Sequence, residues 1–416
     1  MAALAIDVST LYIARSEAEK AAAAGALAGA RAFVSSGFTS GGLGVPSSGS
    51  VQSTVCNGSS GLADVQATAA VNRNLISGKA PASVTTTCAF PNPENPRITV
   101  TVSETNLPTF FSRIWGASNN QVSATAKAEA YNPSGHAAPV RVASVKPWLV
   151  ANCNFHAPPY SALNPNCPIA AGMSADYFVD PANNYQVVNG TNVIGNALTL
   201  QQVDPTLAPV PGLNLGSTFY ALDLPIDAAS ASCPAASSPS CDEVNPAAPG
   251  YAETIACANA NTLKCGDTVT LKLLGGLLTF LTPGAIKAPM CLIHSSANGL
   301  NRGQDIFHPP LSAGDPITIE GGDRNPDPNL QGKVNISRSD SVVTVPLWNG
   351  NIAFSPPGGT ATVIGFMQLG ITQTQGVPGL TSEIDATILN VSGCGTAGGT
   401  TVAGGKTSPI PVRLIQ

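Results

Sequence analysis

Hydrophobic and polar positions follow one pattern at the start of this chain and another over the rest. Residues 2–34 contain no proline and are rich in Ala and Leu, which is the composition of a long helix. The first two turns are apolar nearly all round. Further along, Gly25 and Gly29 lie about one turn apart among alanines, a spacing that favours helix pairing in a membrane. We predict instead a long helix that packs tightly on its own domain.

Shorter elements follow this helix. A Gly/Ser stretch at 35–50 predicts a loop. Apolar residues at mostly helical spacing predict a second helix over Gly61–Ser77. Alternating β-branched residues predict strands over Arg97–Ser103 and Gln121–Tyr131, with a short amphipathic helix between them at Leu107–Gly116. Together these elements make a small α+β unit.

From residue 134 onward, turn-forming residues recur at short intervals and the periodic stretches are of strand type. The candidate strands are Val140–Val150, Thr218–Leu224, Thr268–Leu274, Lys333–Ile336, Val342–Leu347, Thr360–Thr374, Ser382–Val391 and Pro411–Ile415. We therefore predict an α+β fold in three parts. An N-terminal helix (1–36) and a small α+β domain (37–133) precede a β-rich, loop-rich domain (134–416).

Composition narrows the class of protein. The chain has 416 residues, of which 43% are apolar and only 10% are charged, whereas ordinary soluble domains carry about 25% charged residues. This composition excludes a charge-rich disordered chain and a coiled coil. The net charge is −5 and no Lys/Arg cluster occurs, so nucleic acid is not an expected partner.

Cysteines point to the compartment. The ten cysteines, all disulfide candidates, are Cys56, Cys88, Cys153, Cys167, Cys233, Cys241, Cys257, Cys265, Cys291 and Cys394. None forms a C-x-x-C motif, which argues against zinc ribbons and thioredoxin-like sites. An even number of scattered cysteines in a loop-rich chain favours disulfides formed in an oxidising compartment, the alternative being inert buried thiols in the cytosol.

Spacing offers some pairings. Cys56 and Cys88 flank the predicted second helix, so a disulfide between them would clasp its ends. Within the Ala/Ser/Pro-rich segment 227–265, Cys233 with Cys241 and Cys257 with Cys265 are close enough to close small loops.

The N-terminus lacks an export signal. Residues 1–6 are apolar but have no basic residues before them, and Asp7 interrupts the run, so neither a signal peptide nor a spanning helix fits. Because the cysteines predict export, we expect that the true N-terminus lies upstream.

The stretch Leu4–Ala30 resembles the N-terminal segment of the TadE/TadG-like family of Flp (Tad) pilus-assembly proteins. The resemblance rests on the step Ala3–Val8, the residue Tyr12, the charged patch Arg15–Lys20 and the run Ala24–Ala30. Two departures from the family occur. The family usually has an Asp before its Ala-Ala-Leu-Ala run, where this chain has Ala23 and Ala24. The family also has a hydrophobic span before the step that matches Ala3–Val8, and this sequence starts where that span should be ending. The segments at 110–116 and 122–128 also resemble the end of that family's first domain.

The resemblance covers roughly residues 1–131 and implies a pilin-like unit anchored in the inner membrane of a bacterium. The remaining domain would lie in the periplasm or outside the cell. The implied partners are other pilus-assembly or envelope proteins, together with the inner membrane through the N-terminal helix. The implied function is structural, without catalysis and without a cofactor.

Two metal motifs are incomplete. Some relatives carry a D-x-S-x-S metal site, but the segment Asp7–Leu11 matches only its Asp and first Ser and lies inside the predicted helix. The alternating residues Asp323, Asn325, Asp327 and Asn329 resemble the start of a calcium loop. An EF-hand would need Gly and Glu where this chain has Pro328 and Val334, and Asx turns explain the segment without a metal.

The four histidines, His136, His156, His294 and His308, are far apart in the sequence. A catalytic histidine needs a nucleophile or an orienting acid nearby in space. We therefore predict a non-enzymatic component of a Tad-type pilus or related envelope machine. The alternatives are a secreted hydrolase or a calcium-dependent adhesive module in residues 134–416, and a His–acid pair in a concave pocket would favour the hydrolase.

Overall fold

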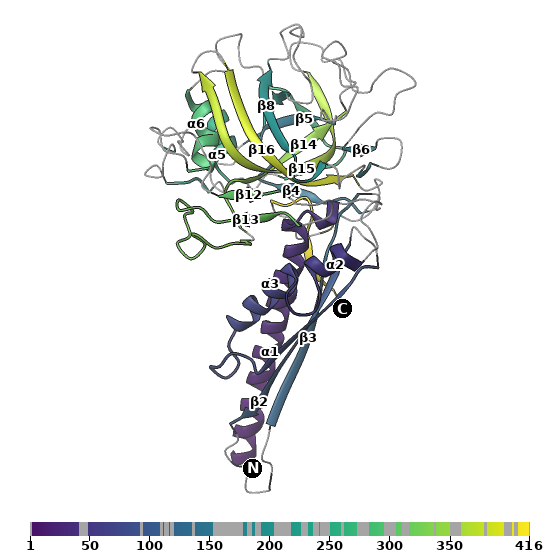
Figure 1. The fold of residues 1–416 in the computed structure, drawn as a ribbon, viewed down its shortest axis with the longest axis vertical. Helices are drawn as coiled ribbons and strands as arrows, with labels where there is room; N and C mark the ends of the chain where they lie inside the picture. The colour runs from purple at the N-terminus through teal and green to yellow at the C-terminus, as the bar shows by residue number, and fades with distance from the viewer. Residues whose placement is uncertain are drawn as a thin grey trace.

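The chain forms a long stalk that carries a β-rich head, as the computed structural model shows (Figure 1). The stalk consists of α1, α2, α3 and the sheet β1, β2, β3 and β17, and the head consists of the other elements. The structure describes residues 2–40, 49–91, 95–108, 111, 116, 120–134, 138–152, 178–180, 185–187, 193–203, 218–225, 232–235, 241, 250–258, 262–272, 283–294, 305–309, 316–336, 338–349, 359–377, 381–394, 402 and 407–415. The structure confirms the predicted α+β fold class. A long N-terminal helix packs on a small α+β unit, and a β-rich region with disulfides follows.

The stalk confirms most of the predicted local elements. Its elements are α1 Ala2–Ser35, α2 Gly49–Val55, α3 Leu62–Asn72, β1 Ser83–Ala89, β2 Arg97–Leu107, β3 Asn120–Ala130 and β17 Val412–Ile415, and the short 3₁₀ turn η1 Phe38–Ser40 leads toward the head. Within the predicted loop at 35–50, η1 occupies Phe38–Ser40 and α2 begins at Gly49, and residues 41–48 lie outside the described residues. Leu107 ends β2 instead of starting a helix, and most of Leu107–Gly116 lies outside the described residues.

Small residues let α1 pack closely. A Cβ added to Gly25 would lie 2.5 Å from a methyl group of Val71, and one added to Gly29 would lie 2.6 Å from Ile98. These contacts bring α1 against both α3 and the sheet. The alternating residues of β2 place Ile98, Val100 and Val102 on this buried side and threonines on the other. The predicted tight packing of the helix on its own domain is confirmed.

The stalk sheet is antiparallel in the order β1-β2-β3-β17. We predicted β17 as part of the strand Pro411–Ile415 and placed it in the C-terminal domain. The strand is confirmed, but it pairs with β3 in the stalk, Val412 opposite Ala130 and Ile415 opposite Lys127. Glu129 holds β17 in the stalk sheet, because its buried carboxylate accepts hydrogen bonds from Arg97 of β2 and Arg413 of β17.

The head is built on one large sheet. Its elements are β4 Arg141–Ala143, β5 Trp148–Ala151, β6 Val179–Asp180, β7 Gln186–Val187, β8 Ala197–Val203, β9 Thr218–Ala221, α5 Tyr251–Ala256, β10 Thr262–Lys264, β11 Thr268–Thr270, α6 Pro283–Leu292, β12 Ile306–His308, β13 Thr318–Glu320, β14 Val342–Trp348, β15 Thr360–Val377 and β16 Thr381–Gly393. The seven strands run in the order β11-β15-β14-β5-β9-β8-β16, and the pairing of β16 with β15 closes all of them except β11 into a ring. Large apolar side chains such as Trp148, Phe219 and Met367 fill the main core.

Some predictions for the head need correction. The candidate strand Lys333–Ile336 is wrong: the segment is irregular, and Asn335 adopts a left-handed backbone with φ of 61° that breaks an extended chain. Val140–Val150 divides into β4 and β5. The helices α5 and α6 and the strand β8 were not predicted, because their short apolar runs carry no clear period.

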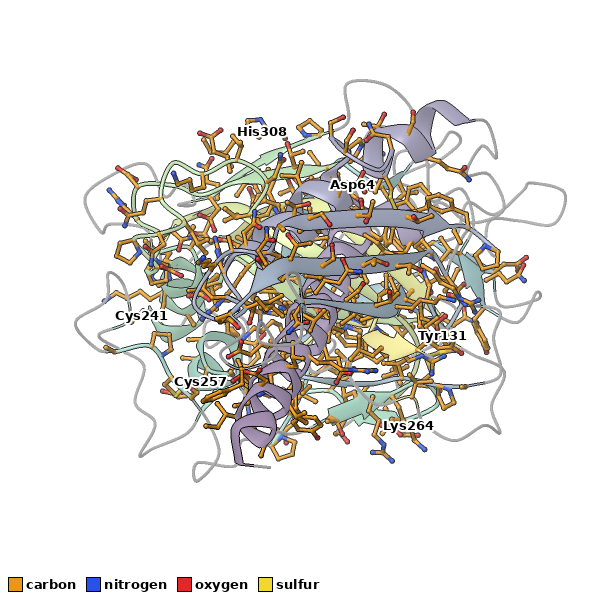
Figure 2. All side chains as sticks on the ribbon, turned by 90° about the horizontal axis from the view of Figure 1, so that it is seen from below. Asp64, Tyr131, Cys241, Cys257, Lys264 and His308 are labelled. Atoms are coloured by element: carbon orange, nitrogen blue, oxygen red, sulfur yellow. A yellow bond between two sulfur atoms is a disulfide. The ribbon has the colours of Figure 1, made fainter. Side chains whose placement is uncertain are left out.

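Three disulfides among the described residues brace the head, joining Cys233 to Cys257, Cys241 to Cys291 and Cys265 to Cys394. The loops proposed from spacing, Cys233 with Cys241 and Cys257 with Cys265, are therefore wrong. Figure 2 shows why Cys257 does not pair with Cys265: Cys257 lies on one side of the head, and Lys264, next to Cys265, lies on the other. Cys241 lies on the same side as Cys257 but bonds to Cys291 of α6. Tertiary position, rather than closeness in sequence, selects the partners.

Polar contacts join head and stalk. Asn390 of β16 donates a hydrogen bond of 2.7 Å to the carbonyl of Val34, near the end of α1. Asn132, just after β3, donates bonds to the carbonyls of Thr39 and Val391. Both side chains are fully buried. Buried amides with satisfied partners fix geometry, so they hold the two parts in one relative position.

Candidate functional site

The free end of α1 exposes large apolar side chains. Ile6, Val8, Tyr12 and Ile13 are 49%, 58%, 75% and 57% exposed, and we call these four residues the apolar tip. From Ala14 onward, one face of the same helix is buried against α3 and the sheet. Figure 1 places the N-terminus at the end of the stalk farthest from the head.

Hydroxyl groups near the apolar tip bond to the backbone of their own helix. The hydroxyl of Ser9 donates to the carbonyl of Ala5 at 2.8 Å, and that of Thr10 donates to the carbonyl of Ile6 at 2.9 Å. Such bonds to the preceding turn satisfy the hydroxyls within the helix. The tip therefore offers a surface that loses few polar contacts when it is covered by apolar groups.

Asp7 has a structural role at this end of the stalk. Its carboxylate is buried and accepts a hydrogen bond of 3.0 Å from the backbone N–H of Phe111. The residue lies within α1, as predicted, whereas the Asp of a D-x-S-x-S metal site lies at the end of a strand. The bond ties the segment that joins β2 and β3 to the helix.

None of the helices in the described part of the chain is long and apolar enough to cross a bilayer.

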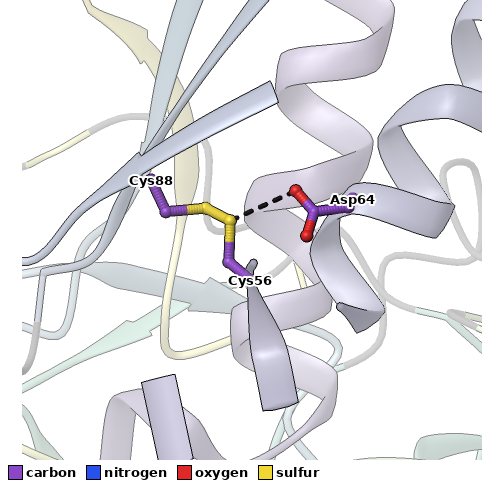
Figure 3. Close-up of side chains that lie close together, drawn as sticks. All are labelled: Cys56, Asp64 and Cys88. Atoms are coloured by element: carbon purple, nitrogen blue, oxygen red, sulfur yellow. Dashed lines mark hydrogen bonds between the residues drawn. A yellow bond between two sulfur atoms is a disulfide. The ribbon is translucent and has the colours of Figure 1, made fainter. Parts of the chain in front are cut away.

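A second cluster lies around Asp64, in the first turn of α3 (Figure 3). Cys56 and Cys88 form a disulfide, as the sequence indicated, and Oδ1 of Asp64 lies 3.3 Å from Sγ of Cys56. The fully buried carboxylate accepts bonds from the N–H groups of Asn57 and Gly58 and from the hydroxyl of Thr86. These bonds hold the turn before α3 against β1.

The same cluster is the one group of His, Cys, Asp and Glu ligands, among the described residues, that could hold a metal ion. Its two sulfur atoms are bonded to each other, whereas cysteine binds a metal as a free thiolate. In the oxidised chain the cluster is therefore a structural clasp.

A third cluster joins three segments of the head. Nε2 of His294, just after α6, lies 3.3 Å from Oδ2 of Asp340, and this hydrogen bond is the main cause that lowers the pKa of Asp340. Lys146 is buried nearby, and its ammonium donates to the carbonyl of Cys257 at 3.2 Å. Burial lowers the pKa of Lys146 to about 8, against the attraction of Asp340.

Asp340 also borders a cavity of about 260 Å³ in the head. The lining residues are Asn325, Pro326, Asp327, Pro328, Leu330, Arg338, Ser339 and Asp340. A His–acid pair beside a cavity meets part of the geometry expected of a hydrolase. However, the hydroxyl of Ser339 accepts a bond from the N–H of Ser341, and the bond described for the ring of His294 goes to Asp340. A nucleophile linked to the histidine is therefore not formed among the described residues.

The calcium-like pattern folds as Asx turns. Oδ1 of Asn325 accepts a bond from the N–H of Asp327, and Oδ1 of Asp327 accepts one from the N–H of Asn329, both at 3.0 Å. Asn325 is buried beside Asp305, whereas Asp323 is exposed. Backbone turns thus account for the alternation, and the spacing alone does not gather the four side chains around one point.

Of the histidines and cysteines that remain from the sequence analysis, some are described by the structure and others are not. His308 pairs with Glu320 on the head surface at 3.0 Å. His136, His156, Cys153 and Cys167 lie outside the described residues. The other eight cysteines all form disulfides, which indicates an oxidising, extracytoplasmic location.

Comparison of the chain with protein-family models, with curated proteins and with solved structures finds no match.

Proposed function

We propose that this chain is a structural or assembly component of a Tad (Flp)-type pilus or a related bacterial envelope machine. The apolar tip is the observation that carries the proposal. Four large apolar side chains stand exposed on the end of a helix whose other half is tightly packed. Exposed apolar patches of this kind mark contacts with a membrane or with other proteins.

The shape supports the same function. The stalk separates the apolar tip from a disulfide-braced head, so one end can be held in or at the inner membrane while the other is presented outside it (Figure 1). The proposed partners are other pilus-assembly or envelope proteins, in keeping with the resemblance of residues 1–131 to the TadE/TadG-like family. The head would act through its surface rather than through catalysis.

The test replaces three residues of the apolar tip, Ile6→Ser, Tyr12→Ser and Ile13→Ser, in the native bacterium. A matched control replaces two exposed apolar residues of the head, Ile306→Ser and Val334→Ser, which are 50% and 66% exposed. We expect the tip variant to leave the membrane fraction and to reduce pili counted by electron microscopy, and the control to behave as wild type. Normal piliation in a strain that lacks the gene would refute the proposal.

The His294–Asp340 pair beside the cavity supports the hydrolase alternative. It predicts that purified chain hydrolyses an activated ester and that His294→Ala abolishes the reaction. Equal, background rates for wild type and variant would count against it.

A further inference from the structure

One edge of the stalk sheet is only half covered. β3 pairs with β2 along nearly all its length, from Asn120 to Glu129. On its other edge it pairs with β17 at Lys127–Ala130 alone. In Figure 1 the C-terminus accordingly ends beside the upper part of β3. Along residues 120–126 that edge has no partner strand among the described residues, and we call it the open edge.

The chemistry of an open edge determines what can fill it. In an antiparallel sheet, alternate residues direct both their N–H and their C=O groups to the same side. The open edge therefore presents a regular row of donors and acceptors that another strand satisfies completely. Proteins normally protect such edges with lysine, proline, a bulge or an inward-pointing charge.

From Val122 to Ala126 the open edge carries none of these protections, and the one irregularity in its pairing with β2 lies before Val122. The sequence from Asn120 to Ala126 is Asn-Gln-Val-Ser-Ala-Thr-Ala, without charge or proline, and its pairing with β2 is regular from Val122 onward. The charged residues of β3, Lys127 and Glu129, lie where β17 already covers it. Protection is thus absent only where the edge is open.

The covered part shows which partner the edge accepts. β17 comes from a segment 284 residues away from its ion-pair partner Glu129, and it runs antiparallel to β3. A further strand placed in line with β17 would continue the same ladder. Val122 and Ala124 are buried toward the helices, so alternate residues of that strand must be small or apolar.

We infer that the open edge of β3 binds an extended segment of another envelope protein. This segment runs antiparallel to β3 in line with β17, is uncharged, lacks proline, and places small or apolar residues toward the helices. Binding is by strand addition, in which main-chain hydrogen bonds give affinity and alternate side chains give specificity. The source of the partner rests on the proposed function, whereas the binding mode rests on the sheet alone.

A peptide with the sequence of residues 98–103, Ile-Thr-Val-Thr-Val-Ser, is a suitable probe, because it is uncharged, lacks proline and already pairs antiparallel with β3 as part of β2. The full oxidised chain is mixed with the peptide and followed by amide hydrogen exchange. We expect exchange across residues 121–126 to slow by about tenfold or more at saturating peptide, with little change in β1. A control peptide with V100P and V102P should give no protection.

Two variants separate binding from folding. Ala124→Lys points a charge inward at the open edge and should abolish the protection, whereas Thr85→Lys on β1 should leave it unchanged. If Ala124→Lys lowers the melting temperature, Thr125→Pro provides a second block. The triple variant of the apolar tip should still bind the peptide, so failure here is distinguishable from failure of the proposed function.

Three results would overturn the inference. The first is slow exchange at residues 121–126 before any peptide is added, which would mean that the chain itself covers the edge. The second is no added protection with the probe. The third is a dimer, seen by native mass spectrometry, that Ala124→Lys dissociates, because the occupant would then be a second copy.

Discussion

Stalk and head achieve a fixed structure by different means. The stalk packs a helix of small residues on a regular sheet, and it uses one disulfide among the described residues. The head closes strands that are distant in sequence around a large-residue core and uses three. Regular packing suits an elongated part, because successive turns of one helix can pack on the same sheet along its length. Crosslinks suit a part whose loops must stay in place without continuous secondary structure.

The sharpest test of this contrast removes one disulfide from each part. Cys265→Ser with Cys394→Ser opens a loop of sequence separation 129 in the head, and Cys56→Ser with Cys88→Ser opens one of 32 in the stalk. Loop-closure entropy predicts losses of about 5 and about 4 kcal/mol of unfolding free energy. Urea denaturation monitored by tryptophan fluorescence measures both. A larger loss for the stalk pair would contradict the contrast.

The close packing of the stalk can be broken by one side chain. Gly29→Leu inserts atoms where even a Cβ would lie 2.6 Å from Ile98. We expect a loss of about 3 kcal/mol, because an overpacked site cannot relax between a helix and a sheet. Ala5→Leu, on an exposed position of the same helix, is the control and should leave the melting temperature nearly unchanged. Equal effects would show that α1 is not tightly packed.

In the head, a buried charge should make stability depend on pH. The pKa of Lys146 is about 8 in the folded chain and near 10.5 when unfolded. Between these values the unfolded chain holds the proton and the folded chain does not, so stability rises with pH across this window. Lys146→Met should therefore stabilise the chain at pH 7 by up to about 3 kcal/mol, with a smaller gain at pH 9. A gain independent of pH would contradict this account.

The smallest effect concerns the return of β17 to the stalk. Glu129→Gln leaves Arg97 and Arg413 facing a neutral amide. Because both arginines are partly exposed, we expect a loss of about 2 kcal/mol, less than for a fully buried pair. Amide exchange at Val412–Ile415 should quicken more than exchange in β2. Unchanged exchange in β17 would show that apolar packing alone holds the strand.

Local pattern predicted the parts of the molecule that depend on neighbours in sequence. The proline-free, Ala- and Leu-rich composition of residues 2–34 predicted α1, and the alternation around Val100 and Ala124 predicted β2 and β3. The Cys56–Cys88 disulfide was predictable because the two cysteines flank the predicted second helix in the sequence.

Other features depend on contacts across the fold. The place of β17 and the pairing of Cys265 with Cys394 follow from how the head closes, which no window of sequence contains. The role of Asp64 was also missed, although an acidic residue in the first turn of a helix is a common signal. Its partners Gly58 and Thr86 come from separate segments.

The position of β17 also has a consequence for synthesis. Every residue of the head precedes β17 in the chain, so a ribosome must translate the entire head before β3 can receive its fourth strand. A product that stops early within the head carries α1 and β1–β3 but leaves Glu129 without Arg413. Completion of the stalk sheet thus requires that translation has passed the head.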